Sequence, residues 1–588
     1  MIPMSPHLLE LAPIERRLVE QYLNTYCRET AFFDPRLATD EAGPVELHSY
    51  IKAWRTAGLI PYLVPFTQAG YQLAGAFSYF SPIGYHRVAK FAWIGKGGDW
   101  RPLTDDATPL IDLIADTLSA TSNQSSEIAD RSGHRLRALM HNSVAHVRRF
   151  HEHKSGVGRS PFLDAEQGLR FGHIFHVTSK AAEGFDDEDM QRYAPELGAS
   201  FCLHYFAVAT SMLETCVVNC TPGGGSLPVD PAAALFAEDL LASGDYHLLP
   251  CHPWQANYLL GLPEIDDLTK NRTLISLGPL GEVAWPTSSV RTVWLPQQNV
   301  FLKLSLNLRI TNFIRNNPSD QVRRALDASL ALSLLPRHML EPAFSILPEL
   351  ASQTLKLPDE ALRAACAVVY RQAMSVTEAE HAQTVVAVLE EPAEGEIPLI
   401  ALLRLSAEGQ PLSEELVRKW WERYLGVTLL PLLRLFLDYG ISLEAHLQNT
   451  LVAFRHGWPV RGYARDLEGA SISRTRFPFL DRLSDNSPAL YNDEQAWHRF
   501  QYYVLVNHLG HFIACLARTG LTTEAMLWQD TATILNAATD DALVQHLLVQ
   551  PTLPAKANML SSFYQHGESP LWVEIPNPMI SRQTYATH

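Results

Sequence analysis

One stretch of the chain collects positive charge with no negative charge to match it. Residues 288–317 read SSVRTVWLPQQNVFLKLSLNLRITNFIRNN and contain no aspartate or glutamate, although the whole chain has a formal net charge of −16. An arginine can hold a carboxylate or phosphate through two hydrogen bonds, whereas a lysine acts as a mobile point charge. Cations gathered in this way repel one another, so the segment predicts a site for a small polyanion. The four cations are Arg291, Lys303, Arg309 and Arg315.

The same segment alternates as a strand does. From Leu302 to Thr311, leucine or isoleucine takes every second position and polar residues take the others. A period of two predicts a half-buried strand with one polar face. The residues from Ser289 to Thr292 predict a second strand just before it, so two neighbouring strands would present cations and hydroxyls together. A polar face that is merely solvated is the ordinary alternative.

A second polar group surrounds a turn and a hairpin further along. EAHLQN, residues 444–449, precedes the predicted hairpin LVAF–RHGWP–VRGYA, which leads into Asp466. Glu444, Asn449 and Asp466 carry the hard oxygen ligands that Mg²⁺ prefers, and Mg²⁺ takes its remaining ligands from phosphates and water. His446 could donate a hydrogen bond to a phosphoryl oxygen. An H-x-x-N followed by an aspartate is also loosely typical of phosphotransferases, and capping or turn roles are the alternative.

Composition limits the classes of protein to consider. The 588 residues are 47% hydrophobic and 19% charged, enough for several cores. The chain has 63 acidic and 47 basic residues. This excess of acidic residues argues against duplex nucleic acid as a partner, because proteins bind it through lysine and arginine. No run reaches about 18 uninterrupted apolar residues, and the N-terminus lacks a cationic leader. With seven cysteines and no CxxC pair, a cytoplasmic protein without a membrane segment is expected.

The order of predicted elements indicates an α+β fold in three parts. Residues 1–160 begin with a predicted helix at 14–30 and also contain a β-like stretch, and residues 161–345 are β-rich. Residues 346–588 are largely helical, with one helix beginning at a capping Ser413 and the next stopping at Gly440. The triple glycine at 223–225 is not followed by GKS or GKT, so no phosphate loop is predicted there.

At these residues the chain resembles the NRPS-independent siderophore synthetases, the IucA/IucC-like family. The matching motifs run in order along most of the chain. One departure is Val177, which follows His176 where the family usually has proline. The motifs are FGHIFHVTSKAAEGF (171–185), YAPEL (193–197), LLPCHPWQ (248–255), PTSSVRT (286–292), KLSLNLRITNFIR (303–315), EAHLQN (444–449) and RD (465–466).

The resemblance implies a cupped-hand fold with a thumb, fingers built on an antiparallel sheet, and a largely helical palm. It implies an ATP- and Mg²⁺-dependent ligase of siderophore biosynthesis, commonly a homodimer. A carboxylate of citrate would attack the α-phosphorus of ATP to give an acyl adenylate and pyrophosphate, and an amine or alcohol would then displace AMP. Free citrate is the expected acid, over a citrate monoamide or 2-oxoglutarate, and the nucleophile is left open.

The resemblance also implies roles by motif position. The implied catalytic residues are His446, Arg315, Lys303 and Arg291. The implied ATP-binding residues are Ser289, Arg291, Thr292, Lys303, His446, Asn449 and Asp466, with His173 and Lys180 on a phosphate-side loop. The implied citrate-binding residues are Thr311, Arg315 and His446, and the implied Mg²⁺ ligands are Glu444, Asn449 and Asp466.

Two other classes of function compete with the ligase. A small-molecule kinase would use the H-x-x-N pattern and release ADP, whereas the ligase releases AMP and pyrophosphate. A non-catalytic binder of citrate or of a ferric siderophore would bind its ligand whether or not ATP and Mg²⁺ were present.

Overall fold

The computed structural model describes residues 10–30, 32–66, 68–153, 160–218, 227–336, 339–393, 395–567 and 569–580. The glycine-rich turn at 223–225 lies outside the described residues. Within the described ranges, no helix has both the length and the hydrophobicity to cross a membrane.

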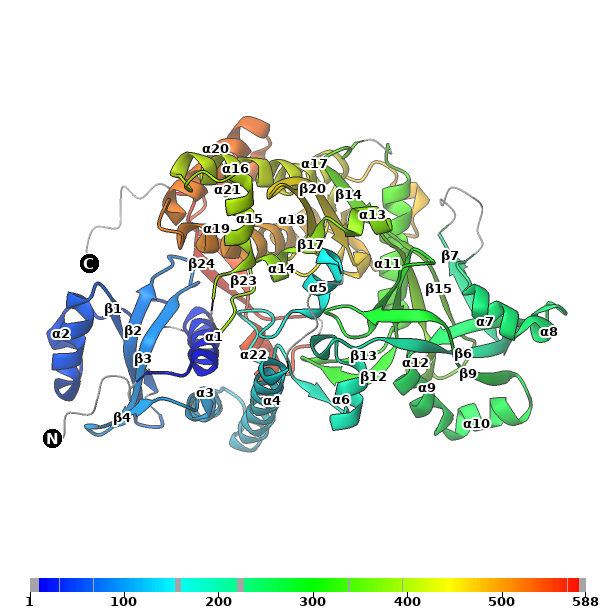
Figure 1. Ribbon diagram of the computed structural model, residues 1–588, viewed down its shortest axis with the longest axis horizontal. Helices are drawn as coiled ribbons and strands as arrows, with labels where there is room; N and C mark the ends of the chain where they lie inside the picture. Colours follow the sequence, from blue (N-terminus) through cyan, green and yellow to red (C-terminus); the bar gives the residue numbers. More distant parts are fainter. Residues whose placement is uncertain are drawn as a thin grey trace.

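The N-terminal part packs helices on a four-stranded antiparallel sheet, at the left of Figure 1. Its first helix lies where the sequence predicts one. The core of this part also contains Met559 and Phe563, so a helix near the C-terminus, α22 (Asn558–Phe563), returns to complete it. The elements are α1 (Pro13–Glu29), α2 (His48–Thr56), β1 (Ile60–Phe66), β2 (Tyr71–Tyr79), β3 (Arg87–Lys96), β4 (Asp99–Leu103), α3 (Thr108–Thr121) and α4 (Ser126–Glu152).

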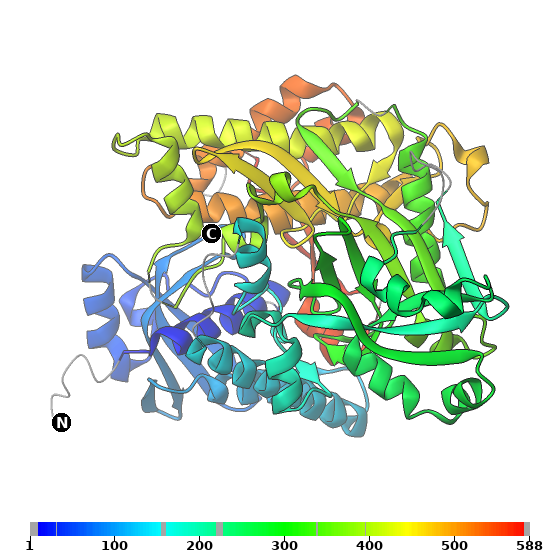
Figure 2. The same cartoon turned by 45° about the vertical axis from the view of Figure 1, so that its right-hand side comes forward.

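An eight-stranded antiparallel sheet forms the opposite side of the molecule (Figures 1 and 2). β10 and β11 are adjacent, and Thr292 lies directly opposite Lys303. Two of its strands come from beyond residue 345, and the division of the chain at residues 160 and 345 stays a prediction. In sheet order the strands are β7 (Leu213–Val217), β15 (Glu349–Leu355), β16 (Val368–Gln372), β11 (Val300–Leu304), β10 (Thr292–Leu295), β9 (Leu274–Pro286), β6 (Phe201–Ala209) and β8 (Tyr246–Cys251).

The predicted strand from Leu302 to Thr311 is wrong in one respect, because it is broken at Ser305. β11 belongs to the large sheet, whereas β12 (Leu306–Ile310) pairs with β13 (Phe313–Arg315) and β5 (Ala182–Glu183) in a separate sheet. At the break the Ser305 hydroxyl donates to the carbonyl oxygens of Ala364 and Ala367 at 2.6 and 2.7 Å, in place of continuing the pattern of the strand. β11 is also covered on both faces, so Lys303 is buried rather than on a wet face.

The Ser289–Thr292 segment is also only partly a strand. Residues 288–291 form a turn, and β10 begins at Thr292. The prediction that two neighbouring strands bring Thr292 and Lys303 together is nevertheless confirmed by their pairing.

The C-terminal part combines helices with a hairpin and lies across the top of Figure 1. The sequence signals here are confirmed: the Ser413 side chain caps α16, Gly440 ends α17 in the left-handed region at φ 66°, and the hairpin forms. With the sheets above, the fold is α+β, as predicted. The elements are α16 (Glu414–Val427), α17 (Leu429–Tyr439), β19 (Thr450–Arg455), β20 (Trp458–Arg465), α18 (Asp493–Phe500), a π-helix (Gln501–Leu509), α19 (Gly510–Ala517), α20 (Glu524–Ala538), β23 (Thr552–Lys556) and β24 (Trp572–Pro576).

A buried glutamate joins the N-terminal sheet to the C-terminal helices. Glu524, the first residue of α20, accepts hydrogen bonds from Tyr79 Oη at 2.7 Å and Ser81 Oγ at 3.2 Å. Burial raises the pKa of Glu524 to about 7, although both hydrogen bonds oppose the rise. From about pH 5 to pH 7 the folded protein therefore keeps a proton that the unfolded chain has released. Stability is then greatest below this window and falls as pH rises through it, by up to about 1.4 kcal/mol per pH unit.

We expect Glu524→Gln to flatten that dependence, because the amide does not titrate but can still bond to both hydroxyls. Urea unfolding at pH 5, 6 and 7 measures the free energy of unfolding for both proteins. A slope in the variant equal to that of the wild type would contradict the assignment.

Candidate active site

Every residue to which the motifs gave a role lines a single cavity of about 630 Å³, whereas Arg309, the other cation of residues 288–317, does not line it. This volume is within the range of about 300–1,000 Å³ that is typical of small-molecule sites. The cavity lies where the eight-stranded sheet, the β12–β13 hairpin and the C-terminal part meet. The assigned residues on its wall are His173, Lys180, Ser289, Arg291, Thr292, Lys303, Thr311, Arg315, Glu444, His446, Asn449 and Asp466.

The turn between β9 and β10 carries Ser289 and Arg291. Val290 at its centre has φ 67°, a left-handed conformation that is strained for a β-branched residue. The backbone N–H of Val290 donates to Thr287 O at 2.9 Å, and Ser289 Oγ accepts from Thr292 N at 3.3 Å. Strain of this kind persists only where the surroundings hold the backbone in place. The turn is therefore a rigid support for its polar side chains.

Two guanidinium groups bring unpaired positive charge to the cavity. Arg291 Nη1 donates to Asn317 Oδ1 at 2.9 Å and to backbone carbonyls, and Arg315 Nη2 donates to Thr311 Oγ1 at 2.5 Å. Burial lowers the pKa of Arg315 to about 10, and the charge of Arg291 adds to this effect. Both groups stay protonated at neutral pH. No carboxylate among the described residues lies within ion-pair distance of either, so this side of the cavity favours an anion.

Lys303 differs, because acids from another part of the chain reach it. Its Nζ lies 2.8 Å from Asp466 Oδ1 and 2.6 Å from Glu468 Oε2. Asp466 Oδ1 is also 3.0 Å from Arg371 Nη2, and Arg371 pairs with the buried Glu349. The expectation that the cations of residues 288–317 have no acidic partner is therefore wrong for Lys303. It is also wrong for Arg309, whose Nε lies 3.2 Å from Glu183 Oε2. Burial opposes ionisation of Asp466, but Lys303 and Arg371 outweigh it and hold the pKa of this carboxyl far below its usual range.

The 444–449 turn presents a histidine with a defined tautomer. His446 Nδ1 accepts from the backbone N–H groups of Gln448 and Asn449 at 3.2 and 3.4 Å. Burial lowers the pKa of His446, although Glu444 opposes this. The ring is therefore neutral at pH 7, and its proton is on Nε2, where it can be donated to a ligand oxygen.

The predicted magnesium ligands offer hard oxygens, but not a closed cage. Burial raises the pKa of Glu444, yet the charges of Lys556 and Arg499 help to lower it below the usual value, so Glu444 is ionised. Both ion pairs of Asp466 go to Oδ1, and Oδ2 takes part in neither. Asn449 Nδ2 donates to Glu444 O at 3.2 Å, which leaves the amide oxygen. The donor set fits an ion that takes most of its ligands from phosphates and water, as Mg²⁺ does.

Lys180 lines the cavity but already has a partner. Its Nζ pairs with Glu196 at 2.5 Å, and the two side chains are 8% and 6% exposed. The phosphate role of Lys180 stays a prediction, but a ligand would have to compete with this buried pair. The neighbouring loop is held by Gln21 of α1, whose Nε2 donates to His173 O at 2.9 Å. Burial lowers the pKa of His173 to about 3, so its ring is neutral.

Several wall residues were missed by sequence reasoning. Tyr502, Tyr503 and Asn507 come from the π-helix, a rare form that is frequent at functional sites. Their segment, QYYVLVNHL, has the sequence of an ordinary buried helix, so nothing in the sequence indicated that it lines the site. Lys556 and Arg371 stand at or near strand ends that are distant in sequence, and only the fold brings them here.

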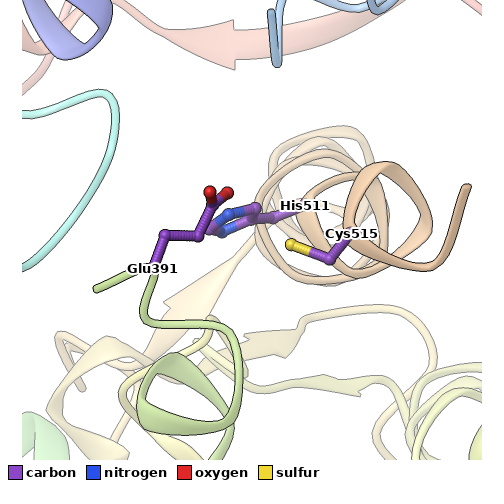
Figure 3. Close-up of side chains that lie close together, drawn as sticks. All are labelled: Glu391, His511 and Cys515. Carbon is purple, nitrogen blue, oxygen red and sulfur yellow. The ribbon is translucent and has the colours of Figure 1, made fainter. Parts of the chain in front are cut away.

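One other cluster has the composition of a metal site but the wrong charges around it. Glu391, His511 and Cys515 bring ligand atoms within 4.8 Å of one another (Figure 3). However, Arg518 Nη1 lies 2.5 Å from Glu391 Oε1, and Arg87 pairs with Oε2. Both carboxylate oxygens are thus taken by cations, which would repel a metal ion. The cluster does not fit a metal site.

Comparison with known proteins identifies the family. A model described as the IucA / IucC family matches residues 161–390, and one described as a ferric iron reductase FhuF-like transporter matches residues 418–571. The L-2,3-diaminopropanoate–citrate ligase of Staphylococcus aureus is 33% identical over 86% of this chain and 89% of its own length. The chain belongs to the IucA/IucC family. The predicted membership is therefore confirmed, and with it the prediction of an enzyme of siderophore biosynthesis.

Other family members agree over nearly the whole length. The spermidine–citrate ligase of Bacillus anthracis is 25% identical over 96% of this chain and 98% of its own. The ATP-bound aerobactin synthetase IucA of Klebsiella pneumoniae has a TM-score of 0.79 at 24% identity and covers 96% of this chain and 100% of its own. This structure supports the fold of the IucA/IucC family over 96% of the chain.

Proposed function

We propose that this protein adenylates a carboxylate of citrate with ATP and transfers the citryl group to an amine. The observation that carries the proposal is the cavity itself. Two guanidinium groups, to which the described residues offer no acidic partner, lie on the same wall as an ionised aspartate, an ionised glutamate and a neutral histidine. Citrate is proposed as the acid because two relatives are named as citrate ligases.

The reaction needs two anions in contact, and the cavity offsets their repulsion. Two unit charges about 4 Å apart interact by about 4 kcal/mol at an effective dielectric constant of 20. Ser289, Thr292, Arg291 and Lys303 would hold the phosphates of ATP. Thr311 and Arg315 would hold the citrate carboxylates, and the Nε2–H of His446 would donate at the α-phosphate. Cations fixed in advance stabilise the charge that develops in the transition state.

The chemistry proceeds in two displacements. A citrate carboxylate oxygen bonds to the α-phosphorus of ATP, and the bond to the β-phosphate oxygen breaks to release pyrophosphate. The amine nitrogen then attacks the acyl carbon of the adenylate, loses a proton, and AMP leaves. No covalent bond to the enzyme is required, because adenylation activates the acid and positioning supplies much of the remainder.

We also propose that the reaction uses Mg²⁺. Asp466, with Glu444 and Asn449 nearby on the wall, would hold it, and it would neutralise phosphate charge when bound. The homodimer likewise stays a proposal.

Asp466→Asn should raise the Mg²⁺ concentration for half-maximal activity by about tenfold or more, the usual cost of losing a partner in a metal site. A Mg²⁺ titration of citrate-dependent ATP–pyrophosphate exchange measures this. Glu468→Gln is the matched control, because Glu468 also pairs with Lys303 but is not a proposed metal ligand. Equal Mg²⁺ dependence in the two variants would contradict the metal role of Asp466.

The acyl acceptor is proposed to be a primary amine. The two curated relatives described above are named for L-2,3-diaminopropanoate and spermidine, and both compounds are amines. Free citrate is proposed as the acid, because both names specify citrate itself. L-2,3-diaminopropanoate is the first acceptor to test.

Hydroxylamine trapping tests the function directly. With citrate, ATP and Mg²⁺, the ligase should form a citryl hydroxamate and release AMP and pyrophosphate. A kinase would release ADP without hydroxamate, and that result would overturn the proposal. The absence of hydroxamate, AMP and pyrophosphate would overturn it as well.

A further inference from the structure

Glu166 lies behind the cavity wall and not on it. It belongs to the short helix α5 (Pro161–Gln167), and its side chain has no exposed surface. It is absent from the residues that line the cavity. The ligands of the proposed reaction would therefore not touch it, and the proposed chemistry gives it no task.

Its carboxylate closes a ring of four residues. Oε2 accepts hydrogen bonds from both the backbone N–H and the hydroxyl of Ser288, each at 3.0 Å. Oε1 lies 2.8 Å from Arg465 Nη1. Arg465 Nη2 donates to the carbonyl oxygen of Gln448 at 3.0 Å, and Gln448 Nε2 donates back to Ser288 Oγ at 3.0 Å. Three segments far apart in the sequence are thus joined through one buried carboxylate.

The segments that α5 joins carry proposed site residues close to Ser288, Gln448 and Arg465. Ser288 precedes the strained turn that presents Ser289 and Arg291. Gln448 lies between His446 and Asn449, and Arg465 precedes Asp466, so the ring holds the phosphate side against the metal side of the cavity.

The charge of Glu166 matters as well as its shape. The Arg465 side chain is 6% exposed, and a buried guanidinium that loses its carboxylate is left uncompensated. The two bonds from Ser288 also hold the turn at its first residue, where the left-handed Val290 requires support. A neutral side chain could accept the hydrogen bonds from Ser288 but could not also compensate the charge of Arg465.

We propose that Glu166 is a positioning residue that sets the Ser289–Arg291 turn relative to Asp466 and the 446–449 turn. It acts through Ser288 and Arg465. The inference rests on the proposed function, because the turn is taken to hold the phosphates of ATP.

Glu166→Gln tests the proposal in the full-length protein. In citrate-dependent ATP–pyrophosphate exchange we expect kcat to fall about 10- to 100-fold, the scale of a misplaced reacting group. The KM for ATP should rise about tenfold while the KM for citrate stays near wild type, because Arg315 is not in the ring. Loss of folded protein alone would lower the apparent kcat but would move neither KM, so the split in KM separates positioning from stability.

Two further variants keep the test decisive. Glu524→Gln is the matched control, since it also changes a buried glutamate that accepts from a serine hydroxyl, and it should keep wild-type KM values. Ser288→Ala removes one arm of the ring and should raise the KM for ATP about three- to tenfold, the cost of one hydrogen bond. In the double variant with Glu166→Gln the effects should be less than additive.

Failure of the inference can be told from failure of the proposed function. If the wild type shows no citrate-dependent exchange, the function itself is wrong. If the wild type is active but Glu166→Gln keeps the wild-type KM for ATP, or matches Glu524→Gln, Glu166 is not a positioning residue. Should Glu166→Gln not fold, a wild-type KM for ATP in Ser288→Ala would overturn the inference.

Discussion

Lys303→Ala is expected to lower kcat/KM for ATP by about 100- to 1,000-fold, the usual cost of removing one preorganised charge from a transition state. Lys303 Nζ lies within 2.8 Å of both Asp466 and Glu468, so its loss does more than remove one cation. Asp466 would stay paired with Arg371, but both carboxylates would lose the charge of Lys303 and would repel the phosphates. Citrate-dependent ATP–pyrophosphate exchange over a range of ATP concentrations measures the effect.

Lys356→Ala is the matched control for that variant. Lys356 is an exposed lysine directly after β15 of the same sheet, and its Nζ donates to Ser211 O. It does not line the cavity, so its removal should leave ATP use unchanged. A folded Lys303→Ala protein with normal ATP dependence would exclude the phosphate role.

Arg315→Ala should reduce kcat/KM for citrate by about 100-fold, with a raised KM for the acid. Truncating one partner of a buried charged contact costs about 2–5 kcal/mol, and Arg315 is a half-buried guanidinium on the cavity wall to which the described residues offer no carboxylate. Its Nη2 is fixed on Thr311 and its Nε donates to Ile310 O at 3.1 Å, so the group is held ready for a ligand. Lysine at this position should recover only part of the loss, because it cannot make two parallel hydrogen bonds.

Arg309→Ala provides the comparison within the same hairpin. Arg309 pairs with Glu183 at 3.2 Å and is not on the cavity wall. Its removal should leave the KM for citrate unaltered. If the Arg309 and Arg315 variants behave alike, Arg315 has no special role toward the acid.

Local patterns predicted much of the fold. The alternation at 302–311 named the residues whose apolar side chains are buried, and Ser413 and Gly440 marked where helices begin and end. These signals depend on neighbours a few residues apart, which interact in the same way in any fold. The break at Ser305 was not visible, because the carbonyl groups to which its hydroxyl donates belong to a segment about 60 residues away.

For the site, the sequence by itself determined which chemical groups the protein has and which motifs carry them. Arg291, Arg315 and His446 were found because their residue types and motif positions are visible in the chain. Only the tertiary structure decided their partners: Lys303 finds its acids more than 160 residues away, and Glu166 joins three distant segments. The physical reason is that charge compensation and burial depend on which segments pack together, and this is settled by the whole chain at once.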